Sequence, residues 1–366
     1  MNSFTFRRHK CKKEIEIKIN AILLEHTQFY LFGLTEITEI IIKFLKDRNK
    51  QIIGIISDDF KPSKLPIPII QINEAERKIP IINCALLRVS QSNKLLKRLK
   101  FDIIIDYFEF NLFDEVLFAF PYIDNNYIDI KTNFHKYQWL YEKLEDTLSK
   151  EIFERVLDMR YNNKLSPILK QNVANQYFDV ISHYNNINVF VDCGGYHGES
   201  TKCFISRNPN YKTIYFFEPF PDAMDIAKNE LRNYDIRYKQ LAVYDKEEQV
   251  SLTGNSEEGN AISLHGDIII GTCAMDNVIV ENVDFIKLDI EGSELEALHG
   301  AEKIIKKYQP IIAVAVYHKQ THFWEISEYL LALMPESRFY LRHYNDGVYD
   351  TILHIIPERF YNNLLN

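Results

Sequence analysis

The segment 190–200 constrains the fold of this chain more than any other, because an apolar run ends there in a glycine-rich turn. Residues 189–191 are apolar, Asp192 follows them, and Gly194 and Gly198 leave no side chains in the turn. A helix that begins after such a turn presents unpaired backbone N–H groups to the same space. The pattern predicts a buried strand, a turn and a helix, which is where an α/β sheet holds a nucleotide-like ligand. A turn built only for packing is the alternative.

The composition excludes several classes of partner. In 366 residues, 43 Lys and Arg stand against 51 Asp and Glu, which gives a net charge of −8. Basic residues gather only in the short patch 7–13, so we expect no nucleic-acid partner. No apolar run reaches membrane-spanning length, and charges interrupt the N-terminal segment where a signal peptide would lie. We therefore expect a cytoplasmic protein with reduced, scattered cysteines, and the sequence leaves homo-oligomerisation open.

Length and glycine usage divide the chain into two α/β domains. Only Gly33 and Gly54 precede residue 190, and the other ten glycines follow it. Both parts alternate short apolar runs with helical periodicity, which is typical of α/β domains. We predict a small Rossmann-like domain over residues 1–125, a helical linker or cover over 126–180, and a larger domain over 181–366.

The larger domain is predicted to hold a mostly parallel sheet flanked by helices, because strands and helices alternate along it. Its last two apolar runs, 338–343 and 351–356, are separated by the turn-rich residues 344–347 and predict a terminal antiparallel hairpin. The other expected strands are 188–192, 213–217, 237–243, 284–289 and 311–317, and the expected helices are 199–206, 222–233, 294–307 and 322–334.

An acidic residue follows the strand next to the glycine turn. Glu218 and Pro219 end the apolar run 213–217. A carboxylate at this strand end can accept hydrogen bonds from both hydroxyls of a ribose, as the acid of dinucleotide sites does. The alternative is an exposed carboxylate at a strand end with no ligand.

Two further acids, Asp289 and Glu291, follow the strand 284–289. They stand at the edge where open α/β sheets bind ligands, and they could hold an ammonium, orient a hydroxyl or, together with Asp276, bind a metal. Acids on different strand ends are more often separate, so no metal ion is predicted. Glu294 is expected only to complement the dipole of the helix that it begins.

Three motifs fall in order at these strand ends: 191–198 (VDCGGYHG), 217–219 (FEP) and 286–294 (IKLDIEGSE). With them, residues 176–357 resemble the FkbM family of S-adenosylmethionine-dependent methyltransferases. The resemblance covers about half of the chain and is supported by weaker matches at 176–179, 242–243, 310–319 and 342–344. It implies a class I methyltransferase Rossmann-like fold with S-adenosylmethionine as the cofactor.

The resemblance also implies roles for single residues. Asp289 would lie near the methyl group as well as contact the cofactor. His197 and Gly195 depart from the family, which carries an acid and an alanine at these positions. The remaining cofactor contacts would come from Asp192, Gly194, Gly195 and Gly198 for the methionine part, Glu218 and Pro219 for the ribose, Ala242 and Val243 for the adenine, and Gln176 and Tyr177 for the carboxylate end.

The chemistry needs alignment of a nucleophile with an activated methyl group and exclusion of water. A base would make an acceptor hydroxyl a better nucleophile. His318 is the leading candidate, because an imidazole titrates near neutral pH and the strand 311–317 ends at the ligand edge. His343 and Asp289 come next, and a His318 that only donates a hydrogen bond is the alternative. The residues expected to contact the acceptor are Glu291, Tyr317 and Arg342.

We therefore expect an O-methyltransferase that acts on a hydroxyl of a bacterial surface saccharide or its sugar-nucleotide precursor. The N-terminal domain resembles the nucleotide-binding-like domain of bacterial sugar-modifying enzymes, but its turn after Gly33 lacks the later glycines, so docking or scaffolding is expected there. Three alternatives remain. They are a methyltransferase of a non-sugar metabolite, an NAD-dependent oxidoreductase, which the DxGxxxG spacing disfavours, and a non-catalytic cofactor-binding assembly subunit.

Overall fold

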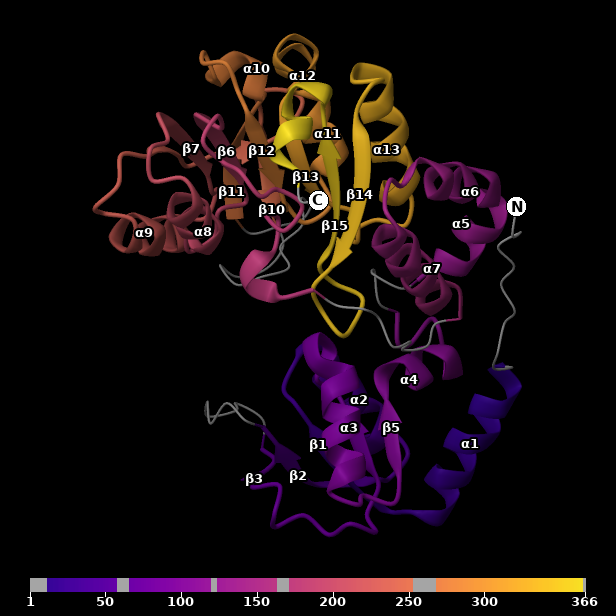
Figure 1. The fold of residues 1–366 in the computed structure, drawn as a ribbon. Coiled ribbons are helices and arrows are strands. Elements are labelled where there is room, and N and C mark those ends of the chain that lie inside the picture. The colour runs from indigo at the N-terminus through magenta and orange to yellow at the C-terminus, as the bar shows by residue number, and fades with distance from the viewer. Residues whose placement is uncertain (1–11, 58–65, 120–123, 163–170, 253–267, 365–366) are drawn as a thin grey trace. The chain divides into compact units, whose positions relative to one another are not determined.

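The computed structural model describes residues 12–57, 66–119, 124–162, 171–252 and 268–364 (Figure 1). Contacts divide the chain into two compact units. The first comprises Met1–Thr132, Glu154–Ile168 and Asn345–Tyr349, and the second comprises Asn133–Phe153, Leu169–Tyr344 and Asp350–Asn366. The domain boundaries expected after residues 125 and 180 remain a prediction. In the described ranges, no helix is both long enough and apolar enough to cross a membrane.

The first unit is built on a parallel sheet in the order β3-β2-β1-β4-β5. Its central strand β1 is buried after its first residue and pairs with β2 on one side and β4 on the other. Helix α2 packs on β2, and α3 packs on β4 and β5. The bounds are β1 (Gln28–Phe32), β2 (Gln51–Ile56), β3 (Ile69–Ile70), β4 (Ile81–Asn83), β5 (Ile104–Asp106), α1 (Lys12–Glu25), α2 (Glu36–Lys46), η1 (Leu86–Arg88), α3 (Val89–Arg98), α4 (Tyr107–Phe113) and α5 (Asn126–Thr132).

The second unit holds a sheet in the order β14-β15-β13-β12-β6-β7-β8. The strands from β13 to β8 run parallel, whereas β15 is antiparallel to both β13 and β14. The predicted α/β fold with a terminal hairpin is thereby confirmed. The strands are β6 (Val189–Cys193), β7 (Thr213–Phe217), β8 (Arg237–Lys239), β12 (Phe285–Leu288), β13 (Ile311–Ala315), β14 (Arg338–His343) and β15 (Thr351–Ile356).

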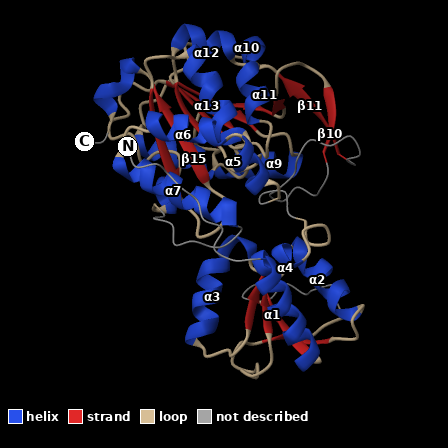
Figure 2. Cartoon of the chain, turned by 90° about the vertical axis from the view of Figure 1, so that its right-hand side faces the viewer, coloured by secondary structure: helices blue, strands red, loops and turns tan. Residues whose placement is uncertain are grey.

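Helices surround the strands of this second sheet (Figure 2). Helix α13 packs on α6, α11 and α12. A second, smaller sheet has the order β10-β11-β9. These elements are α6 (Phe134–Lys143), α7 (Thr147–Asn162, which runs from the second unit into the first), α8 (Glu199–Arg207), α9 (Pro221–Glu230), α10 (Met275–Val278), α11 (Glu294–His299), α12 (Glu302–Tyr308), α13 (His322–Leu333), β9 (Ala242–Val243), β10 (Gln249–Leu252), β11 (Ile268–Cys273), η2 (Val173–Asn175) and η3 (Glu358–Asn363).

Two expected elements are each divided in the structure. The expected strand 237–243 becomes β8 and β9, which belong to different sheets. The expected helix 294–307 becomes α11 and α12, which meet near Gly300, where a Cβ would lie 2.0 Å from the carbonyl oxygen of Tyr244. The Asp276 carboxylate then accepts hydrogen bonds from the backbone N–H groups of Lys303 and Ile304, at 3.0 and 2.9 Å, in the first turn of α12.

Aromatic side chains fix β6 against its neighbours. Phe190 of β6 stacks on Phe204 of α8 with ring centroids 4.4 Å apart, and it meets Phe285 of β12 edge-on at 5.3 Å. Phe178, which precedes β6, contacts all three rings. These rings are almost fully buried, so the end of β6 and the start of α8 are held in place by packing.

Burial of His354 on β15 should make the stability of the second unit depend on pH. Burial lowers the pKa of His354 to about 3, from 6.5 when exposed. The unfolded chain therefore gains a proton as the pH falls below 6.5, while the folded chain stays neutral at this site, so stability falls. From about pH 7 to about pH 5 this linkage amounts to about 2 kcal/mol.

Between about pH 7 and about pH 5, the free energy of unfolding of His354→Gln should fall by about 2 kcal/mol less than that of the wild type. Urea unfolding at the two pH values measures this difference. The matched control is His135→Gln, because His135 is exposed. An identical pH dependence in His354→Gln and the wild type would contradict the assignment.

Candidate active site

The glycine turn after β6 lies against the ends of the neighbouring strands. Gly194 and Gly198 adopt φ values of +75° and +94°, which favour glycine. A Cβ on Gly194 would lie 2.0 Å from the carbonyl oxygen of Asp289, and one on Gly195 would lie 2.2 Å from the ring of Phe216. The turn therefore needs its glycines for close packing, whether or not a ligand is bound.

Asp192 is held inside the protein beneath this turn. The side chain is fully buried, and its Oδ2 accepts hydrogen bonds from Ser200 Oγ at 2.5 Å and Thr201 Oγ1 at 2.7 Å. Its Oδ1 lies 3.2 Å from Lys287 Nζ. The direct contact with the cofactor that was expected of Asp192 remains a prediction, while the observed contacts attach the turn to α8 and β12.

Lys287 is a residue of this site that sequence reasoning missed. It is 3% exposed in the middle of β12, and Nζ donates hydrogen bonds to the carbonyl oxygens of Gly194, at 2.6 Å, and Cys193, at 3.3 Å. Burial alone would lower the pKa of Lys287, but the carboxylates of Asp192 and Asp289 raise it above its usual value. The sequence did offer one signal for this residue, a lysine inside an otherwise apolar strand. Such a lysine is buried, and a buried lysine requires a partner.

Glu218 stands at the end of β7 and faces the glycine turn. Its Oε2 accepts a hydrogen bond from the backbone N–H of Tyr196, and its Oε1 accepts one from Phe220, both at 3.0 Å. Burial raises the pKa of Glu218, although these N–H groups oppose the rise. Each carboxylate oxygen keeps a second lone pair, which a hydroxyl can use.

The segment expected to hold an adenine lies next to Glu218. Ala242 of β9 packs against a buried apolar cluster that contains Phe220, and Tyr196 packs against the same cluster. Val243 is buried in β9 and pairs with Cys273 of β11. The structure thus brings together the turn, the strand-end acid and the predicted adenine segment.

A second group of predicted residues gathers around Asp289 at the end of β12. Tyr177 donates its hydroxyl to Asp289 Oδ2 at 2.5 Å, and Tyr317 donates its hydroxyl to Oδ1 at 3.1 Å. The Gln176 amide donates to the Tyr177 hydroxyl oxygen at 3.1 Å and to Asp350 Oδ1 at 3.2 Å. Burial raises the pKa of Asp289. Segments far apart in the sequence therefore converge on one carboxylate.

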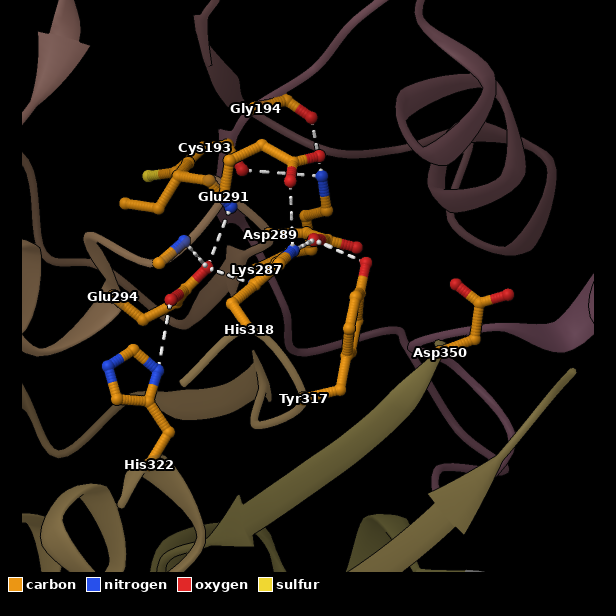
Figure 3. Close-up of polar contacts among 12 residues, drawn as sticks. Cys193, Gly194, Lys287, Asp289, Glu291, Glu294, Tyr317, His318, His322 and Asp350 are labelled. Atoms are coloured by element: carbon orange, nitrogen blue, oxygen red, sulfur yellow. Dashed lines mark hydrogen bonds and ion pairs between the residues drawn. The ribbon is translucent and has the colours of Figure 1, made fainter. Parts of the chain in front are cut away.

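His318, just beyond β13, lies among three carboxylates (Figure 3). Its Nε2 is 3.5 Å from Asp289 Oδ1 and 3.3 Å from Glu291 Oε2, and its Nδ1 is 2.8 Å from Glu294 Oε1. We call these four residues the Asp289–His318 cluster. Burial would lower the pKa of His318, but the carboxylates, Glu294 first, raise it well above its usual value. The carboxylates thus favour the charged form of the imidazole, and the base role expected of His318 remains a prediction.

Glu294 begins α11 as expected, but its carboxylate has a further role. The side chain is fully buried, and Oε1 accepts hydrogen bonds from the backbone N–H groups of Ile290, at 3.0 Å, and Gly292, at 3.3 Å. Its Oε2 lies 3.2 Å from Nδ1 of His322. Burial alone would raise its pKa, yet the two imidazoles hold that pKa well below its usual value. Glu294 therefore fixes the orientation of His318, which the sequence did not reveal.

Arg342 and His343 lie on β14, the edge strand of the sheet. Strand β15 lies between β14 and β13. The Arg342 guanidinium donates to Asp146 at 2.7 Å and to Ser149 Oγ at 2.9 Å. His343 is buried, with Nδ1 2.9 Å from Thr351 Oγ1 across the hairpin. Their expected roles, acceptor contact and proton transfer, remain predictions.

A family model matches the part of the chain that contains this site. Residues 192–346 match the model of the Methyltransferase FkbM domain. Over these residues the chain is similar to the FkbM methyltransferase domain. That match contains the glycine turn, Glu218 and the Asp289–His318 cluster, and it confirms the resemblance seen in the sequence. No curated protein matches the chain.

Solved structures give the extent of the shared fold. The chain is similar to the crystal structure of methyltransferase FkbM from Methylobacillus flagellatus KT, with 20% identity, 92% of each chain covered and a TM-score of 0.68. This similarity confirms a class I methyltransferase Rossmann-like fold and includes most of the chain. An rRNA methylase from Streptococcus thermophilus is 14% identical over 52% of this chain and 98% of that one, with a TM-score of 0.34. Aeropyrum pernix fibrillarin, solved with bound S-adenosyl-L-methionine, is 12% identical over 47% and 67%, with a TM-score of 0.31.

The ion pair of Lys287 with Asp192 should be required for stability of the second unit. Lys287→Met leaves a buried carboxylate without its cation, so we expect a loss of about 3 to 5 kcal/mol in the free energy of unfolding, measured in urea. The double variant Asp192→Asn/Lys287→Met removes both charges and should regain at least half of that loss. A loss below about 1 kcal/mol in Lys287→Met would contradict this view of the pair.

Proposed function

We propose that this chain transfers a methyl group from S-adenosylmethionine to a hydroxyl of a bacterial surface saccharide, such as capsule or lipopolysaccharide, or of its sugar-nucleotide precursor. One observation carries the proposal: within the residues similar to the FkbM methyltransferase domain, the glycine turn, Glu218 and the Asp289–His318 cluster follow the adjacent parallel strands β6, β7, β12 and β13. Ligands of open α/β sheets bind at this edge. The choice of a saccharide rests on the family resemblance and on the N-terminal unit.

The residues at this edge fit the parts of S-adenosylmethionine. Glu218 offers lone pairs to the ribose hydroxyls, and Ala242 offers an apolar surface to the adenine. Because its glycines carry no side chains, the turn 194–198 leaves the backbone open to the cofactor. Gln176 and Tyr177 supply hydrogen-bonding groups for the amino acid end of the cofactor. When bound, the sulfonium supplies an activated methyl group. The part of the chain that this proposal leaves unassigned is the N-terminal unit.

The Asp289–His318 cluster is the proposed place where the acceptor hydroxyl is held. The oxygen of an acceptor hydroxyl held there would take the methyl group that bound S-adenosylmethionine would supply, S-adenosylhomocysteine would leave, and a carboxylate of the cluster would accept the hydroxyl proton. The three carboxylates contact His318 and raise its pKa well above its usual value, so we propose that His318 positions these carboxylates. Burial raises the pKa of Asp289, which makes that carboxylate a better proton acceptor.

Glu218→Ala should weaken cofactor binding. Hydrogen bonds from the ribose to a charged carboxylate contribute about 1.5 to 3 kcal/mol, so the affinity for S-adenosylhomocysteine should fall about 10- to 100-fold. Calorimetric titration of both proteins measures this directly. Glu230→Ala is the matched control, because Glu230 is exposed on α9 and pairs only with Lys202 among its described contacts. Equal affinity in the wild type and Glu218→Ala would remove the ribose assignment.

The acceptor class can be tested by methyl transfer from labelled S-adenosylmethionine into fractionated bacterial polysaccharide and sugar-nucleotide pools. We expect label in a saccharide fraction, in an alkali-stable ether linkage. Label in a non-sugar metabolite would keep the methyl transfer and reject the saccharide. Tight cofactor binding without transfer to any fraction would instead favour a non-catalytic assembly subunit.

A further inference from the structure

The segment 175–179, which precedes β6, serves two different places in the second unit. Gln176 and Tyr177 make the contacts of the candidate active site that lead to Asp289. The other residues of the segment line a pocket of about 480 Å³, and neither Gln176 nor Tyr177 is among the described residues of its wall. We call it the Asp179–Arg207 pocket, and its wall includes Asn175, Phe178, Asp179, Ile181, Tyr184 and Arg207.

The wall of this pocket combines apolar side chains with a few polar ones. Phe178, Ile181 and Tyr184 are between 1% and 5% exposed, so packing holds them in place. Sites for small molecules usually have volumes of about 300 to 1,000 Å³, an apolar lining and a few polar groups that orient the ligand. The size and lining of the Asp179–Arg207 pocket are therefore those of a small-molecule site.

Arg207, at the end of α8, brings a positive charge to the pocket. Its Nη1 donates to the carbonyl oxygen of Cys203 at 3.0 Å, and its Nη2 donates to Asn175 Oδ1 at 2.6 Å. The guanidinium also lies over the ring of Phe178, 5.3 Å from its centroid. The partners that the described part of the chain gives this guanidinium orient it, but they carry no negative charge.

Asp179 brings a negative charge to the same pocket. Its Oδ1 accepts the Tyr344 hydroxyl at 2.6 Å and lies 3.9 Å from Nε2 of His354. Burial lowers the pKa of His354 to about 3, so this imidazole is neutral near pH 7. Burial raises the pKa of Asp179, while the Tyr344 hydrogen bond and the charge of Arg342 oppose the rise. Arg342 itself pairs with Asp146 at 2.7 Å, so an ammonium placed at Asp179 would be a new and closer positive partner.

The two charges act on one hydroxyl in the wall of the pocket. The Tyr184 hydroxyl donates to the carbonyl oxygen of Phe178 at 2.7 Å. Burial raises the pKa of Tyr184, the positive charge of Arg207 opposes that rise, and the negative charge of Asp179 adds to it. Because charge interactions weaken with distance, both groups lie near this hydroxyl. A single small molecule can therefore reach both.

We propose that the Asp179–Arg207 pocket binds a small zwitterion, an α-amino acid with an apolar side chain. Its carboxylate pairs with Arg207, its ammonium group pairs with Asp179, and its side chain packs on Phe178 and Ile181. Hydrogen bonds between charged groups that are partly removed from water are the stronger ones. An anion without an amine would face the carboxylate of Asp179, and a cation without an acid would face Arg207, so the pocket disfavours both.

The test is calorimetric titration of the full chain with L-leucine at about pH 6.5, where α-amino groups are protonated. Two analogues of similar shape each lack one charge: leucinamide has no carboxylate, and 4-methylpentanoate has no amine. We expect a single site for leucine. Each analogue should bind about 10- to 100-fold more weakly, because one charged hydrogen bond is lost.

Substitutions identify which charge of the ligand meets which residue. Asp179→Asn should bind leucine and 4-methylpentanoate about equally, because the amine has then lost its partner. Arg207→Gln should likewise bind leucine and leucinamide about equally. Arg207 is half-buried, so Arg207→Gln tests the site even if Asp179→Asn fails to fold. The matched controls are Arg232→Gln and Asp235→Asn, because both residues are exposed and lie outside the pocket, and their affinity for leucine should equal that of the wild type.

Three results would overturn the proposal. They are no binding of leucine by the wild type up to about 10 mM, leucine bound no more tightly than either analogue, and equal affinity for leucine in the wild type and Arg207→Gln. Binding of leucine should persist with S-adenosylhomocysteine at saturation. Its complete loss would place leucine at the amino acid end of the cofactor and would also overturn the proposal.

The titration with leucine alone contains no methyl donor or acceptor. Its failure therefore leaves the proposed methyl transfer standing, and failure of methyl transfer leaves a measured amino acid site standing.

Discussion

The buried contact of Lys287 with Asp192 and with the carbonyl oxygens of residues 193 and 194 joins the two central strands of the second unit. This contact connects the glycine turn that follows β6 to β12, the strand that Asp289 follows. Gly194 also lies directly against the carbonyl oxygen of Asp289, where a Cβ would be 2.0 Å away, so the turn packs closely against the start of the cluster. Buried charge and close packing thus hold the proposed cofactor residues against the proposed acceptor residues.

The two charged groups on β12 have different characters. Lys287 and Asp192 neutralise each other within the core, and hydroxyl and carbonyl partners occupy their remaining atoms. The Asp289–His318 cluster is only partly buried, with the side chains of Asp289 and Glu291 13% and 29% exposed. A buried pair of opposite charges holds a fixed geometry, whereas a partly exposed group of carboxylates and an imidazole is suited to take up a proton. Lys287 on β12 thus holds the structure, whereas Asp289, directly after β12, belongs to the group proposed to take part in the reaction.

Sequence patterns predicted those parts of the site that depend on local signals. The glycine spacing and the strand-end position of Glu218 follow from the chain itself, so the turn and the acid next to it could be located. Contacts between strands and helices could not be predicted, because a sequence does not show that Lys287 faces Asp192 or that Glu294 lies between two histidines. The helix expected at 294–307 failed for a similar reason, since the carbonyl that leaves no room for a side chain at Gly300 belongs to a distant segment.

We propose that the turn, Glu218 and the Asp289–His318 cluster form one site for a methyl donor and its acceptor. The most direct test is the crystal structure of the chain with S-adenosylhomocysteine bound. We expect the ribose hydroxyls to contact Glu218, the homocysteine part to lie over the turn at Gly194, and the sulfur to be directed toward Asp289. A cofactor bound elsewhere, or bound here with its sulfur directed away from Asp289, would contradict it.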